Sequence, residues 1–153
     1  MWMTAPQSRL YPKFAAYVRE SMPTCKTVPK IIQALKDHGG LSESQARDAL
    51  SWGHAPLVVV ADLWDEVAWK SEGNGRFHPS RPYQIDVAEH RVTQFETPGA
   101  GGTDTTATGA RVYIVGATLL HELCHWGLHR AGRTEAGEAG RAFERAVYGK
   151  QID

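Results

Sequence analysis

The pattern of apolar and polar residues predicts three helices in the first third of the chain. The first extends from Arg9 to Glu20, and the second from Pro29 to His38, where a glycine pair provides a stop. The segment SESQ predicts the start of a third, with Ser42 as the N-cap and Gln45 reaching back to it. This third helix should end near Gly53.

The middle of the chain changes to strand patterns. Pro56 to Leu63 is an apolar, β-branched run that is typical of a buried strand, and Tyr83 to Ala88 alternates like a second strand. Turn residues fill the stretch between them, so a hairpin or a meander is expected. Pro98 to Ala110 is rich in Gly and Thr and lacks core-forming residues, which predicts a flexible surface loop over 98–110.

The last third predicts two more helices. Val112 to Leu128 is almost wholly apolar, as expected of a helix buried in the middle of a domain. A shorter helix from about Glu138 to Tyr148 should stop at Gly149. These elements predict an α+β fold over residues 1–153 as a single domain, with residues 1–40 as a candidate helical N-terminal extension.

Length and charge narrow the class of protein. A chain of 153 residues is long enough to bury about 70% of the surface that its unfolded form exposes. Seventeen basic residues balance seventeen acidic ones without long runs of either sign, so neither a nucleic acid nor a membrane is expected as a partner. No apolar run is long enough to span a membrane, and the first residues do not resemble a secretory signal. Cys25 and Cys124 are expected to be buried free thiols.

One apolar stretch contains a group of polar residues, HELCHW, from His121 to Trp126. On a helix His121 and His125 project from the same face one turn apart, so both imidazoles can reach one metal ion. Glu122 lies beside them and could take a proton from a water whose pKa the metal has lowered. Chance is a poor explanation, because random placement would give only about 0.02 such patterns in this chain. Without a metal, several buried polar groups would lack partners.

A catalytic zinc site needs a third protein ligand. His129 is excluded, because on a continuous helix it would lie about 12 Å along the axis from His121. A metzincin would have histidine where this chain has Ala131 and glycine where it has Leu128, so that subclass is excluded too.

The remaining candidates follow the motif, in TEAGEAGRAFERAVYG. We favour Glu144, which shares a helix face with Gly140 and other small residues that would permit a close approach. Glu138 is the alternative, either as the ligand or as a hydrogen-bond acceptor for a ligating histidine, whereas Glu135 is expected in a loop. Either helix glutamate could instead be a solvated residue at the helix start. Tyr148, one turn after Glu144, could stabilise an oxyanion or simply close the core.

The strings TLLHELCHWG and GEAGRAFERAVYG resemble the zincin-like metallopeptidase toxin domains of bacterial polymorphic toxins and type VI secretion effectors. The likeness extends upstream to SWGHAPLVVVADL, GRFHPSRPYQIDV and VTQFE. It implies a zincin-like fold in which a small mixed sheet precedes the helix with the histidines and a ligand-bearing helix at the C-terminal end. His121 and His125 would be zinc ligands, Glu122 the general base, and a glutamate of the second string the third ligand.

The resemblance also implies an antibacterial role. Such a peptidase would be made in the cytoplasm, travel on a secretion-system carrier without a signal peptide, enter a target cell, and have an immunity protein as partner. The substrate would be protein or, alternatively, the peptide stems of the cell wall, because both present amide carbonyls. A third hypothesis is a non-catalytic binding domain that zinc only stabilises, with four protein ligands that include Cys124 or His129.

Overall fold

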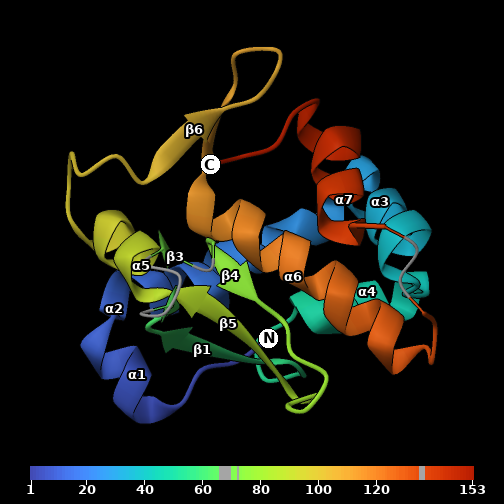
Figure 1. The fold of residues 1–153 in the computed structure, drawn as a ribbon, viewed down its shortest axis with the longest axis horizontal. Helices are drawn as coiled ribbons and strands as arrows, with labels where there is room; N and C mark the ends of the chain where they lie inside the picture. The colour runs from blue at the N-terminus through green and yellow to red at the C-terminus, as the bar shows by residue number, and fades with distance from the viewer. Residues whose placement is uncertain (66–69, 72, 135–136) are drawn as a thin grey trace.

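The computed structural model describes residues 1–65, 70–71, 73–134 and 137–153 (Figure 1). The helices are α1 (Ala5–Leu10), α2 (Pro12–Ala16), the π-helical turn η1 (Tyr17–Ser21), the 3-10 helix η2 (Met22–Thr27), α3 (Pro29–Gly39), α4 (Glu43–Leu50), α5 (Glu89–Glu96), α6 (Ile114–Arg130) and α7 (Ala139–Tyr148). The strands are β1 (Leu57–Ala61), β2 (Trp64–Asp65), β3 (Lys70–Ser71), β4 (Gly75–Arg76), β5 (Gln84–Ala88), β6 (Thr103–Thr105) and β7 (Arg111–Tyr113). The predicted α+β class is confirmed.

Local sequence signals account for most of the helix ends in the first third. Gly40 follows α3 with φ of 63°, a left-handed conformation that glycine adopts without strain. Gln45 N–H donates to Ser42 Oγ at 3.1 Å and Ser42 N–H to Gln45 Oε1 at 2.8 Å, so the predicted capping box caps α4. The helix expected over residues 9–20 is instead broken at Tyr11, because the residue before Pro12 is disfavoured from the helical conformation.

The main sheet has the strand order β1-β5-β4. β1 and β5 are parallel, with Val58 opposite Ile85 and Val60 opposite Val87, so these two strands do not form a hairpin with each other. The chain crosses over between these two strands rather than turning back directly. The antiparallel pair in this mixed sheet is instead β4 and β5, with β4 at the edge.

Helix α6 runs through the middle of the molecule, with the sheet on one side and α3 and α7 on the other (Figure 1). Leu119 and Leu123 of α6 are fully buried in one hydrophobic core. Phe14 and Leu35 from the first forty residues are fully buried in the same core. The N-terminal helices are therefore part of the domain's core rather than an appendage to it.

The Gly/Thr-rich segment differs from the loop that the sequence predicts. Thr103 to Thr105 form β6, which pairs antiparallel with β7 to make a short hairpin. The N–H of Ala107 in its turn donates to the carbonyl of Tyr148 at 2.9 Å, so the hairpin also contacts the end of α7. Backbone pairing needs no apolar side chain, which is why composition gave no sign of it.

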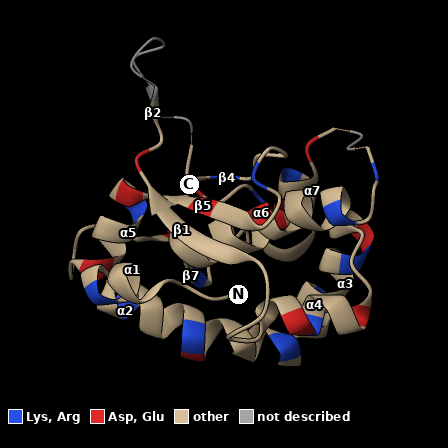
Figure 2. Cartoon of the chain, turned by 90° about the horizontal axis from the view of Figure 1, so that it is seen from below, with Lys and Arg blue, Asp and Glu red and all other residues tan. Residues whose placement is uncertain are grey.

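Charged residues of both signs are mixed along the helices in the view of Figure 2. In the part of the chain that the structure describes, no helix has the length and apolar character needed to cross a membrane.

Candidate metal centre

Helix α6 places the two histidines of the motif side by side. The ring centroids of His121 and His125 are 5.1 Å apart, as their spacing of one turn requires, and each side chain is 17% exposed. The residues around them on α6 are buried, so the two imidazoles are among the few polar groups on this helix that reach an open surface.

Glu138 lies against both imidazoles. Its Oε1 is 3.0 Å from Nε2 of His121 and 2.9 Å from Nε2 of His125. Its other oxygen accepts the N–H of Arg141, which makes Glu138 the N-cap of α7. Burial opposes ionisation of Glu138, but the Arg141 N–H and the two histidines outweigh burial and hold its pKa below the ordinary value. The carboxylate is therefore ionised and fixed in position.

The close approach of α7 to α6 depends on Gly140. A Cβ atom at this position would lie 2.2 to 2.4 Å from ring atoms of His121, a distance that real side chains do not adopt. Glycine thus lets the start of α7 lie directly against the ring, and this brings Glu138 within reach of both histidines.

Glu144, about one and a half turns into α7, contacts the other ring nitrogen of His121. Its Oε1 is 2.7 Å from Nδ1, and its Oε2 accepts the N–H of Ile152 at 3.0 Å. The residue is only 3% exposed. Burial lowers the pKa of His121, but the hydrogen bond to Glu144 and the charges of Glu122 and Glu138 outweigh burial and raise it to about 9. In metal-free protein this imidazole holds a proton at neutral pH.

Glu122 follows His121 on α6 and lies close to Gly75 of the edge strand β4. It is 5% exposed, and burial raises its pKa to about 7, against the opposing effects of His121, His125 and a hydrogen bond from the backbone N–H of Phe77. A carboxyl group that titrates near neutral pH can both accept and donate a proton there.

β4 approaches α6 closely at Gly75. A Cβ atom at Gly75 would lie 2.5 Å from Cγ2 of Thr118 and 3.0 Å from Cγ of Glu122. The absence of a side chain at Gly75 therefore sets the separation between the edge strand and Glu122.

An open cleft of about 510 Å³ contains these groups. It lies between the sheet edge and α6, and the start of α7 and the C-terminal residues form its other walls. Its lining includes His121, Glu122, His125, Glu138 and Glu144.

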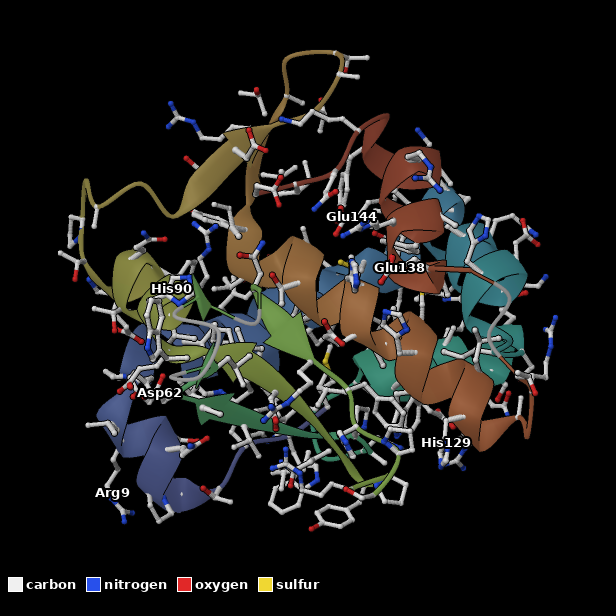
Figure 3. All side chains as sticks on the ribbon, in the orientation of Figure 1. Arg9, Asp62, His90, His129, Glu138 and Glu144 are labelled. Atoms are coloured by element: carbon white, nitrogen blue, oxygen red, sulfur yellow. The ribbon has the colours of Figure 1, made fainter. Side chains whose placement is uncertain are left out.

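The structure brings some of the expected ligands together and separates others. Ligand atoms of His121, His125 and Glu138 all lie within 4.8 Å of one another. Glu144, which the sequence favoured as a ligand, lies outside this group and contacts Nδ1 of His121 instead. Figure 3 labels both glutamates at α7. Two imidazole nitrogens and a carboxylate oxygen are a donor set that suits a divalent transition metal.

The other candidates lie elsewhere. His129 lies near the end of α6, with its ring 5.4 Å from that of Phe77 at one end of the cleft (Figure 3). Tyr148 is absent from the described lining of the cleft and packs against Phe143, and an oxyanion role for it stays a prediction. Glu135 lies outside the described residues.

Sequence reasoning missed Ile152, Phe77 and Gly75, whose backbones contact or adjoin the acidic groups of the site. Every residue except proline has a backbone N–H, so the sequence does not indicate which of these groups will contact an acidic side chain. Gly75 did offer a signal, because a glycine within a strand often marks a close approach of another element.

A comparison with known protein families supports a metal-dependent chemistry for this cleft. No curated protein and no solved structure gave a significant match to the chain. The family model described as metallopeptidase toxin 3 matches residues 7–149, a range that contains both histidines and all three glutamates of the site. The chain belongs to the metallopeptidase toxin 3 family.

Proposed function

We propose that this protein is a zinc-dependent metallopeptidase that hydrolyses peptide bonds, with His121, His125 and Glu138 as the zinc ligands. The observation that carries the proposal is the convergence of both Nε2 atoms on one oxygen of Glu138, beside the buried Glu122. Three protein ligands leave a position for water, as catalytic zinc sites require.

The choice of Glu138 over Glu144 rests on which nitrogen each contacts. Glu138 shares the Nε2 side with His125, so an ion there could reach all three groups. Both oxygens of Glu144 have hydrogen-bond partners, and the bond to Nδ1 fixes the orientation of His121 and leaves Nε2 for the metal.

A zinc ion held by these residues would supply Lewis-acid activation of water and of the scissile carbonyl. Glu122 is the general base: its carboxylate takes the proton of the attacking water and later passes it to the leaving amine. The Phe77 N–H and the burial of Glu122 hold the carboxylate in place for both transfers.

The edge strand offers a means of binding the substrate. β4 pairs with β5, and its two residues, Gly75 and Arg76, line the cleft. An extended peptide lying in the cleft beside β4 would present its carbonyl to the site.

The proposal includes a biological role. The protein acts as an antibacterial toxin that is delivered into a competing cell by a secretion-system carrier, and an immunity protein protects the producer. The toxin character of the family supports this role. The substrate is a protein of the target cell.

The deciding experiment compares wild type with Glu122→Gln, which keeps the shape of the side chain but cannot act as a base. We expect both proteins to bind one equivalent of zinc, and only wild type to cleave a panel of unfolded proteins. The same assay on purified cell wall identifies a stem-peptide hydrolase if only cell wall is cut. Equal cleavage by the two proteins would overturn the assignment of Glu122, and a wild type that binds zinc but cuts neither substrate would indicate a non-catalytic domain.

A further inference from the structure

The segment after α7 returns to the metal centre. Gly149, with φ of 78°, ends the helix, and the chain then lies along one end of the cleft. The N–H of Ile152 donates to Oε2 of Glu144 at 3.0 Å, in a buried position. The Ile152 side chain is 2% exposed and packs in a small cluster with Ile114 and Ala117.

The β6–β7 hairpin holds this segment from outside the cleft. Nζ of Lys150 lies 2.9 Å from Oδ2 of Asp104 in β6, and the N–H of Asp153 donates to the same oxygen at 3.2 Å. Figure 3 shows the hairpin and the last residues of the chain lying together beyond the Glu144 end of α7. Ile152 is thus fixed on both sides by contacts of its neighbours with Asp104.

A third contact reaches across to the sheet side. Nδ2 of Asn74, just before β4, donates to the carbonyl of Ile152 at 3.4 Å, and Oδ1 of Asn74 accepts Nε–H of Arg91 at 2.7 Å. The backbone of Ile152 therefore contacts both walls of the cleft, Glu144 through its N–H and Asn74 through its carbonyl.

We propose that the Ile152 backbone, held by the β6–β7 hairpin, is a positioning element for the metal site that acts through Glu144 on His121. A carboxylate bound at both oxygens has one orientation, whereas a carboxylate bound at one oxygen can rotate about its side-chain torsions. A residue that hydrogen-bonds to a ligating histidine fixes the orientation of the ring. Loss of such a residue typically lowers metal affinity by about 10- to 100-fold. This inference rests on the proposed metal site, but it assigns a role to residues outside it.

The test compares Ile152→Pro, which removes the N–H, with Ile152→Val, which keeps the N–H and most of the packing. Zinc affinity is measured by competition with a chromogenic chelator, and the visible absorption of the cobalt-substituted protein reports ligand geometry. We expect Ile152→Pro to bind zinc about tenfold more weakly than Ile152→Val and to show an altered cobalt spectrum. The melting temperature of the metal-free proteins measures any purely structural effect.

Asp104→Ala provides a second variant, because Asp104 is absent from the described lining of the cleft. We expect a smaller loss of affinity in the same direction, and if Ile152→Pro does not fold, this variant decides. If the variants keep the zinc affinity and cobalt spectrum of wild type, with or without a lower melting temperature, this inference is overturned while the proposed metal site stands. Failure of wild type to bind zinc would instead overturn the proposed function and this inference with it.

Discussion

Oε1 of Glu144 lies 2.7 Å from Nδ1 of His121, on the side of the ring away from Nε2. α7 and its N-cap residue thus supply two carboxylates to one imidazole, because Glu138 contacts Nε2. The two contacts have different consequences. Oε1 of Glu138 also contacts His125. Glu144 is buried and contacts no second histidine in the described part of the chain.

The two glutamates should therefore differ in their effect on metal binding. Glu138→Gln removes the charge of a ligand, and we expect zinc affinity to fall by more than about a hundredfold. At a pH above about 9, where His121 is deprotonated in both proteins, Glu144→Gln removes only the orienting contact, and we expect a loss of about 10- to 100-fold with the metal still bound at high concentration. Competition titrations with a chelator measure both. The reverse order of effects would make Glu144 the ligand, as the sequence alone suggested.

Metal affinity should also depend on pH through His121. Its pKa is raised to about 9 in the metal-free protein, so the ring must lose a proton before it can bind a metal. We expect apparent zinc affinity to rise by about tenfold per pH unit from near neutrality up to about pH 9 and then to level off. Removing Glu144 as acceptor should lower this pKa and move the plateau to lower pH. A pH-independent affinity in wild type would contradict the assignment.

The raised pKa of His121 also predicts how the stability of the metal-free protein depends on pH. Because the folded-state pKa of His121 lies above its ordinary value of 6.5, the protonated ring stabilises the metal-free fold below that pH. This contribution is lost as the pH rises through about 9. Thermal melts of metal-free wild type and Glu144→Gln should converge at high pH.

The elements that carry the site were predictable because strong local signals mark them. The apolar run around His121 and His125 predicted α6, and the spacing of the two histidines predicted that their rings would meet. The glycine stops after α3 and α7 and the capping box of α4 lie where the sequence indicated. These signals depend on neighbours within a turn or two of the chain.

The contact of Glu138 with both histidines was not predictable in the same way. The argument from helix faces assumed that both residues are helical, but Glu138 is an N-cap with φ of −110° and ψ of 96°. An extended residue does not follow the angular spacing of a helix, so its side chain can meet His125 as well as His121. The parallel pairing of β1 with β5 was missed for a related reason, because strand partners far apart in sequence leave no local signal.

Gly140 should be required for metal binding because its lack of a side chain lets α7 contact His121. Gly140→Ala should force α7 away from His121 and lower the free energy of unfolding by about 1 to 3 kcal/mol, partly offset by the better helix propensity of alanine. The same change should weaken zinc binding. Gly116→Ala is the matched control, since its Cβ would crowd the Tyr17 hydroxyl at 2.2 Å, away from the metal centre. We expect both variants to lower the melting temperature and only Gly140→Ala to change zinc affinity. Equal zinc affinities of the two variants would show that the close approach of α7 to His121 is not critical for metal binding.

Gly75 should matter for catalysis rather than for the metal. The Cβ of Gly75→Ala would push β4 away from Thr118 and Glu122, and a shift of the base by about 1 Å can reduce kcat by about a hundredfold. Zinc content should not change, because the three atoms nearest to this Cβ belong to Thr118, Asp86 and Glu122 rather than to a histidine. The Thr118→Ser change removes the nearest methyl group and keeps a hydroxyl that can donate to the Ile114 carbonyl. Adding it to Gly75→Ala should restore part of kcat, whereas Thr118→Ser alone should have little effect. Activity that stays near wild type in Gly75→Ala would mean that the edge strand does not position Glu122.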